Sequence, residues 1–349
     1  MIPAFLVLMV FLAVAEVSLR VGPIADAVPQ PDLYYQPGVQ TRLDALDATT
    51  DRYGGIDLLF VGSSVVRTNF QPLAFDDELL ARTGHELVSF NGGLSDLFPD
   101  PVRLYLDKFW FRHSSPSIVV QGVRYNEVRI NLEAMDFQRF QEGRLEPHWL
   151  DDTLLGAIQA WTMERSVLFQ HAGALTQTLS DLASGTERRT GFAIDERGNT
   201  RTNLTLGEAR ETKPIEDIPG SDAAIAGYDD PIDAANFEFG LRVLSETHRL
   251  VASQGAVYVL VNIPEHADKF LKQPDGQERY ALYVEQLRSF AESEGILFFD
   301  PTNGLASTYA DDTPFSDFHH MNPEGARGFS VQFADFVGRH LDEVLGPSS

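Results

Sequence analysis

Short apolar runs alternate with helix-patterned segments along most of the chain. The runs are apolar at nearly every position, which is typical of strands buried on both faces of a parallel sheet. They cover residues 56–61, 86–90, 117–121, 256–262 and 296–299. Helical patterns cover residues 72–83, 101–113, 235–253 and 278–294, and a last helix runs to about Leu345. This order predicts an α/β domain with a mostly parallel sheet and helices on both faces.

The alternation breaks down between residues 130 and 230. Amphipathic helix candidates over residues 154–182 are followed by a polar run over residues 184–230. About 100 residues is far longer than an ordinary connection. The segment 130–230 is therefore predicted to be an insertion, either a helical cap over the site or a disordered excursion. We expect a helical cap with a mobile, acidic second half.

The N-terminal segment is uniformly apolar. Residues 1–15 contain no charged side chain, which is typical of an export or membrane signal. As a helix they would reach about 22 Å, short of the ~30 Å hydrocarbon core. Ala13-Val14-Ala15 has the form of a signal-peptidase site. Residues 1–21 are thus expected to be a signal anchor, or a signal peptide if cleaved after Ala15, with the remainder outside the cytoplasm.

A Pro-rich stretch, residues 22–55, separates this segment from the first apolar run and predicts an irregular spacer. The α/β domain is then expected to comprise residues 56–129 and 231–349, interrupted by the insertion. A membrane partner is expected through the N-terminal segment. Protein partners cannot be predicted from these patterns.

Charge and cysteine content narrow the function classes. The formal net charge is -24, from 51 acidic and 27 basic residues, so a nucleic-acid partner would be bound against strong repulsion. The chain has no cysteine, which excludes disulfides, zinc–thiolate sites and thiol nucleophiles. A nucleophile, if there is one, must come from another residue type.

Two serines directly follow the first predicted strand, in the turn Gly62-Ser63-Ser64. A hydroxyl in a strand-to-helix turn lies beside a helix N-terminus, which stabilises developing negative charge. Such a turn is consistent with a serine nucleophile. It is also consistent with serines that only cap the following helix.

The segment 316–325, just before the C-terminal helix, carries the second candidate group. Asp317 precedes His320 by three residues, so that one turn can hold both, the acid fixing the imidazole and its far nitrogen accepting a proton from a serine. The neighbouring His319 also allows a metal site as an alternative, although no further ligands occur at typical spacing. We expect no metal and no cofactor.

These two segments resemble the first and last blocks of the SGNH (GDSL-like) hydrolases. Phe60-Val61-Gly62-Ser63-Ser64 is similar to the first block, with Ser63 in place of the usual aspartate, and Asp317-Phe318-His319-His320-Met321-Asn322 with Gly325 is similar to the last. The resemblance implies a three-layer, flavodoxin-like fold with a five-stranded sheet. It also implies Ser64 as nucleophile, His320 as base and Asp317 as the acid that orients the base.

The middle blocks match less closely. Residues 89–96 resemble the second block, but Asp96 stands where the oxyanion glycine is often found, which leaves Gly93 as the alternative donor. Residues 121–127 correspond to the third block, with Asn126 as its amide or, on a structural reading, as a turn residue closing the strand. The resemblance thus implies an oxyanion hole of the Ser64 and Gly93 N–H groups and Asn126. Arg124, Asp96 and His319 are candidate substrate contacts.

The layout as a whole is similar to membrane-anchored SGNH proteins of polysaccharide O-acetylation. It implies a serine esterase or O-acyltransferase acting on acyl esters, for example acetyl groups of cell-surface polysaccharide, through Ser64, His320 and Asp317. Water as acceptor gives an esterase, and a sugar hydroxyl gives an acyltransferase. The alternatives are a non-catalytic glycan-binding or scaffold protein of the envelope, and a metal-dependent hydrolase.

Overall fold

The computed structural model describes most of the predicted α/β domain. The described residues are 14, 16, 17, 38–95, 97–129, 194–199, 234–271, 274–302, 313–341 and 344. The chain divides into two compact units, residues 1–41 with 136–192 and residues 42–135 with 193–349. The sheet and the candidate site both belong to the second unit. Most of the predicted N-terminal signal and of the insertion lie outside the described residues.

The sheet has five strands: β1 Leu58–Val61, β2 Ser89–Asn91, β3 Ile118–Val123, β4 Val257–Asn262 and β5 Leu297–Phe299. Their order is β2-β1-β3-β4-β5, and every neighbouring pair is parallel. This is the strand order of the flavodoxin-like α/β fold, in which ligands bind at the carboxyl ends of the strands. The predicted fold class is confirmed.

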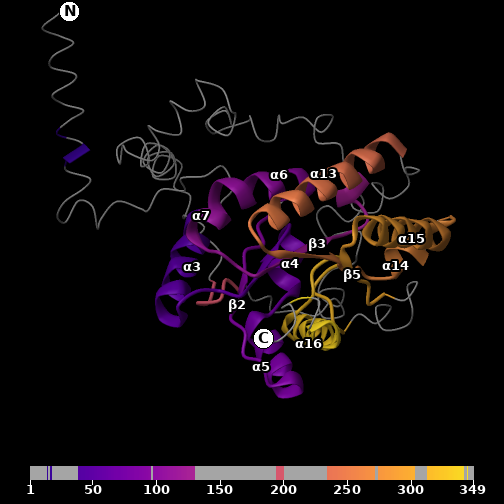
Figure 1. Cartoon of the computed structure of the whole chain (residues 1–349). Helices are drawn as coiled ribbons and strands as arrows, with labels where there is room; N and C mark the ends of the chain where they lie inside the picture. Colours follow the sequence, from indigo (N-terminus) through magenta and orange to yellow (C-terminus); the bar gives the residue numbers. More distant parts are fainter. Residues whose placement is uncertain are drawn as a thin grey trace, which may run out of the picture. The chain divides into compact units, whose positions relative to one another are not determined.

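Helices cover both faces of the sheet (Figure 1). On one face, α16 Pro323–Arg339 packs against α5 Pro72–Thr83 and α4 Ser64–Asn69. On the other, α13 Ala234–Ser253 packs against α6 Pro99–Tyr105, which continues through the π-helical turn Leu106–Trp110 into α7 Phe111–His113. The other helices among the described residues are α3 Val39–Tyr53, the 3₁₀ turn Glu127–Arg129, α14 Asp268–Leu271 and α15 Gly276–Glu294.

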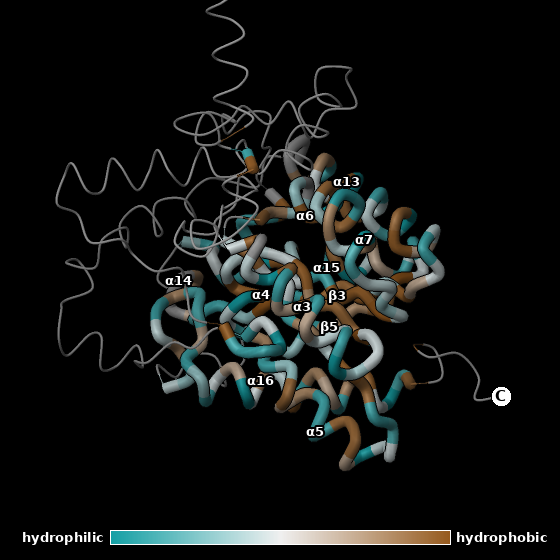
Figure 2. The backbone as a smooth tube through the Cα atoms, turned by 90° about the vertical axis from the view of Figure 1, so that its left-hand side faces the viewer, coloured by the Kyte–Doolittle hydropathy of each residue, from teal (hydrophilic) through white to brown (hydrophobic). Residues whose placement is uncertain are grey.

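An aromatic core fixes α4 against the sheet. Phe60 of β1 stacks on Phe70, just after α4, with ring centroids 4.2 Å apart, and Phe75 stacks on Phe333 of α16 at 5.5 Å. Truncating a buried phenylalanine to alanine typically costs about 3–5 kcal/mol, because a cavity remains. Figure 2 shows the same layering as hydrophobic strands between helices of mixed hydropathy. The element that carries Ser64 therefore rests on a rigid base.

A helix occupies part of the expected spacer. Residues Val39–Tyr53 form α3, so the prediction of an irregular segment over 22–55 is wrong for these residues. Leu43 and Leu46, three positions apart, are both buried and give the helix an apolar face. The upstream prolines mask this short pattern in the sequence, because they lie before the helix and not within it.

A short turn from the expected mobile half of the insertion packs against the domain. The Asn91 N–H of β2, an edge strand, donates to the Arg197 carbonyl over 2.9 Å. The buried Arg197 guanidinium binds the Asp76 carboxylate at 3.1 Å and the Ser89 carbonyl at 2.9 Å. The turn formed by residues 194–199 thus covers an edge that would otherwise expose unpaired backbone groups. These six residues of the segment expected to be mobile thus make defined contacts with the domain.

No helix among the described residues is long and apolar enough to cross a membrane. Only Val14, Glu16 and Val17 of the predicted signal belong to that set. The membrane expectation therefore stays a prediction.

Candidate active site

The turn after β1 gives its two serines different roles. A Cβ on Gly62 would lie 2.7 Å from the Gly122 carbonyl oxygen, and the φ of Gly62 is +144°, so this tight turn needs glycine. Ser63 is the N-cap of α4, and its hydroxyl accepts the Val65 N–H, as expected for a capping serine. Ser64 is the first residue of the helix. Of the two candidate serines, Ser63 takes the cap and Ser64 is directed elsewhere.

The Asp-x-x-His spacing produces a compact loop between residues 313 and 321. The Asp317 Oδ1 accepts the backbone N–H groups of His319 and His320, each at 2.8 Å. Asn322 then caps α16 by accepting the N–H groups of Glu324 and Gly325. The carboxylate thus folds back over its own backbone and brings its second oxygen towards the imidazole.

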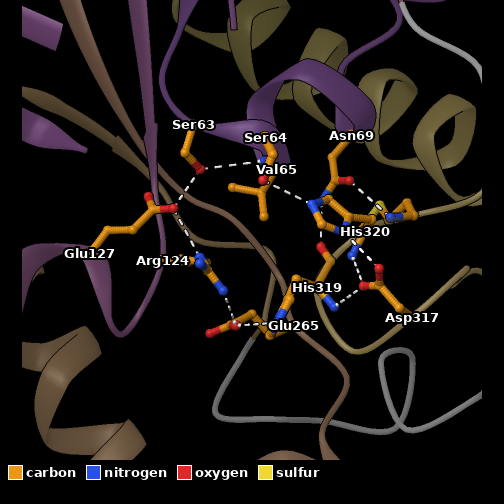
Figure 3. Close-up of polar contacts among 11 residues, drawn as sticks. Ser63, Ser64, Val65, Asn69, Arg124, Glu127, Glu265, Asp317, His319 and His320 are labelled. Atoms are coloured by element: carbon orange, nitrogen blue, oxygen red, sulfur yellow. Dashed lines mark hydrogen bonds and ion pairs between the residues drawn. The ribbon is translucent and has the colours of Figure 1, made fainter. Parts of the chain in front are cut away.

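The three predicted catalytic side chains meet at this loop (Figure 3). His320 Nδ1 lies 2.7 Å from Asp317 Oδ2, and His320 Nε2 lies 2.9 Å from Ser64 Oγ. The His320 side chain is 22% exposed, so the site can be reached from solvent. This chain of contacts, from hydroxyl to imidazole to carboxylate, has the arrangement needed for nucleophilic catalysis by serine.

The electrostatics of Asp317 suit an orienting role. Burial alone would raise the pKa of its carboxyl group. The hydrogen bond and charge of His320, with smaller contributions from His319, outweigh burial and lower the pKa below its ordinary value. The carboxylate is therefore ionised at neutral pH and can hold the Nδ1 proton of the imidazole.

Asn69, the last residue of α4, clamps the backbone on both sides of His320. Its side chain is fully buried, its Nδ2 donates to the His319 carbonyl at 3.3 Å, and its Oδ1 accepts the Met321 N–H at 2.9 Å. The same six-residue helix therefore begins with the hydroxyl and ends with the group that holds the imidazole (Figure 3). Asn69 follows two other polar residues, Arg67 and Thr68, so nothing in the sequence marks it for this role.

Gly93 has another role than the one predicted. Its N–H donates to the Asn91 Oδ1 at 2.9 Å, and the Asn91 Nδ2 binds carbonyl oxygens at the end of α4, including that of Phe70 at 2.9 Å. A Cβ on Gly93 would lie 2.4 Å from the Arg67 backbone nitrogen, which explains why glycine stands there. The geometry contradicts Gly93 as an oxyanion donor, because its N–H is bound within the turn. Asp96 lies outside the described residues.

In the third predicted block, Asn126 lies in a turn and Arg124 binds buried carboxylates. Asn126 is half-buried in the turn after β3, and its side chain makes no hydrogen bond to another residue that the structure describes. Arg124 is directed to two buried carboxylates, with Nε 2.8 Å from Glu127 and Nη1 3.5 Å from Glu265. His319 Nδ1 lies 3.3 Å from the same Glu265.

Neither glutamate could be assigned from the sequence, although Glu127 adjoins Asn126 and Glu265 follows closely on a strand end. Acidic residues are common in this chain, so two more after strands carry little signal. In the described part of the chain, no cluster of three or more histidine or acidic residues is arranged to hold a metal ion. The described side chains that contact one another directly at the site are the serine hydroxyl, the imidazole and the Asp317 carboxylate.

Comparisons with known proteins found matches among solved structures but none in sequence. No protein-family model matches the chain, and no curated protein matches it in sequence. Among solved structures, a lipase/acylhydrolase from Enterococcus faecalis aligns with 10% sequence identity and a TM-score of 0.38. The alignment covers 82% of this chain and 97% of the other.

Proposed function

We propose that this protein is a serine hydrolase or acyltransferase that acts on acyl esters. The observation that carries the proposal is the continuous contact from Ser64 Oγ through the His320 ring to Asp317. The roles are those expected from the resemblance to SGNH hydrolases. The two contacts match the 2.6–3.2 Å hydrogen-bonding reach between nucleophile, base and orienting group.

The reaction would proceed in two steps, acylation of Ser64 and then deacylation. In the first, the Ser64 oxygen attacks the ester carbonyl, His320 Nε2 takes the hydroxyl proton, and the alcohol leaves with that proton as an acyl-enzyme forms. In the second, water or another hydroxyl gives its proton to His320 and attacks the acyl-enzyme. The acyl group then leaves as acid or new ester, and Ser64 regains its proton.

The oxyanion would be stabilised by the Ser64 N–H and the Asn126 amide. Ser64 is at the first position of α4, where backbone N–H groups have no partner within the helix. Asn126 lies in the turn after β3, next to Glu127, which accepts the Ser63 hydroxyl, and its amide makes no competing bond among the described residues. Preorganised donors of this kind are each worth about 10²–10³ in rate.

The location and substrate form the finer part of the proposal. The apolar residues 1–15 support an anchored or exported protein whose domain lies outside the cytoplasm. In that location, acetyl esters of cell-surface polysaccharide are the substrate class that the family resemblance suggests. A cap formed by residues 130–230 would favour transfer over hydrolysis, since it would keep water away from the acyl-enzyme.

The test is covalent labelling of the purified full-length protein with a fluorophosphonate. We expect labelling of the wild type and of Ser63→Ala, mapped to Ser64 by mass spectrometry, and none in Ser64→Ala. Ser63→Ala controls for the site of attachment, because it removes the neighbouring hydroxyl and keeps Ser64; its labelling is scored as present or absent and not as a rate. An unlabelled wild type would favour the alternative, a non-catalytic glycan-binding protein of the envelope.

A further inference from the structure

Two buried carboxylates beside the site take no part in the proposed reaction. Glu127 and Glu265 are each 1% exposed. Burying an ionised carboxylate is costly unless a counter-charge and hydrogen bonds accompany it. Here one guanidinium, that of Arg124, lies at 2.8 Å from Glu127 and 3.5 Å from Glu265. The burial of two carboxylates beside the catalytic groups is energetically costly, and their contacts indicate what they do there.

The two glutamates of this cluster each contact a residue that adjoins a catalytic one. The Ser63 hydroxyl donates to Glu127 Oε1 at 2.5 Å, and Ser63 immediately precedes the nucleophile. His319 Nδ1 lies 3.3 Å from Glu265 Oε1, and His319 immediately precedes the base. Figure 3 shows the resulting row of contacts, which runs from the serine turn to the histidine loop.

Arg124 and Glu265, in the middle of the row, follow two paired strands of the sheet. Arg124 directly follows β3, and Glu265 follows β4 after a short connection. These two strands are paired over their full length, from Ile118 with Val257 to Val123 with Asn262. The distance between the ends of β3 and β4 is therefore fixed by backbone hydrogen bonds, and the row transmits that distance to the two loops.

We propose that Arg124, with Glu127 and Glu265, is a positioning unit that sets the placement of the Ser64 turn relative to the His320 loop. The proposal rests on the function proposed above, because it concerns where that nucleophile and base stand. The glutamates are shielded from solvent, so they act through Ser63 and His319 and not on the substrate. Burial raises the pKa of Glu127, while the Arg124 charge and the Ser63 hydrogen bond oppose this shift.

The same domain offers a matched control. Arg197 and Asp76 form another buried ion pair, at 3.1 Å, which joins the 194–199 turn to α5 and β2. Its chemistry is that of the Arg124 cluster, but it has no contact with Ser63, Ser64, His319 or His320. Weakening this pair should change stability without moving the catalytic groups.

The experiment is the kinetics of fluorophosphonate inactivation, which separates the binding constant KI from the bond-forming rate constant kinact. We expect Glu127→Gln and Glu265→Gln to lower kinact by about 10- to 100-fold, because small misplacements of reacting groups cost that much. KI should stay within about twofold, since the binding surface is untouched. The double variant should be little worse than either single variant, because coupled residues are not additive.

The control Asp76→Asn should change the pH dependence of stability and keep the wild-type kinact. A wild-type kinact in folded Glu127→Gln, fully additive effects, or an equal fall in Asp76→Asn would each overturn the inference. Should the glutamine variants not fold, Ser63→Ala and His319→Gln cut the row at its two ends, and unchanged kinact in both would overturn it as well. If the wild type itself showed no labelling at Ser64, the proposed function would be overturned, and this inference with it.

Discussion

Replacing Asn69 by alanine should detach the base from the helix that carries the nucleophile. The change removes both side-chain contacts that hold the loop, to the His319 carbonyl and the Met321 N–H. Each buried partner left unpaired costs about 1–3 kcal/mol, so we expect the two to lower the free energy of unfolding by about 2–6 kcal/mol.

The kinetic effect should exceed what lost folding explains. The Nε2 of His320 lies 2.9 Å from the Ser64 hydroxyl, and a shift of the loop by about 1 Å would end that hydrogen bond. Misplacement on this scale costs about 10²-fold in rate. In Asn69→Asp the acceptor for Met321 remains, but an oxygen replaces the donor to the His319 carbonyl and repels it. That variant should be at least as slow as Asn69→Ala.

The assay combines urea unfolding with the rate constant of fluorophosphonate labelling, measured where each variant is fully folded. Asn262→Ala is the control, because Asn262 is also fully buried and its side chain bonds Tyr280 and Asp300 and not the loop of residues 313–321. It should lose comparable stability and label at the wild-type rate. A wild-type rate in folded Asn69→Ala, or an equal fall in Asn262→Ala, would refute the clamp.

Three further predictions concern the site and the domain edge. Asp317→Asn should stay folded and lose about 10³–10⁴-fold in turnover of a chromogenic acetyl ester, because the imidazole is no longer held in the required tautomer; unchanged turnover would remove Asp317 from the mechanism. His320→Ala should be inactive while His319→Ala keeps measurable turnover, and the reverse result would show the wrong histidine was chosen. Burial raises the pKa of Asp76 to about 6, so the folded state retains a proton that the unfolded state loses above about pH 4. The stability from this group is thus present below pH 4 and is lost as the pH rises through 6, by about 3 kcal/mol. In urea unfolding, the free energy of unfolding of Asp76→Asn should lack this decrease between pH 4 and 6.

The sequence could predict the parts of the site that depend on local spacing. The buried runs locate the strands, the segment 72–83 is a helix with those same bounds, and a serine after the first strand is visible directly. Asp317 and His320 are found because three residues separate them and one turn joins them. Periodicity and spacing are properties of residues that are close in the sequence, so they can be recognised without a structure.

The supporting residues could not be predicted, because their roles depend on contacts between distant segments. Asn69 and the His319 carbonyl are 250 positions apart, and Arg124 and Glu265 are 141 apart. Which segments meet depends on the strand order and on the paths of the loops, and neither can be derived from a single sequence. Gly93 shows the converse error, since its spacing suited an oxyanion donor while its N–H is bound by Asn91.

The shortness of α4 has a consequence for how the protein becomes active. A helix of six residues is far below the ~12–15 residues that an isolated helix needs in water. It is held at its far end by Asn91 and by a loop that the chain supplies only after residue 313. A nascent chain that has not yet released this last tenth of its length therefore lacks an ordered nucleophile. Reactivity towards a serine-directed probe should appear only when synthesis and folding are complete, which makes it a direct reporter of the finished molecule.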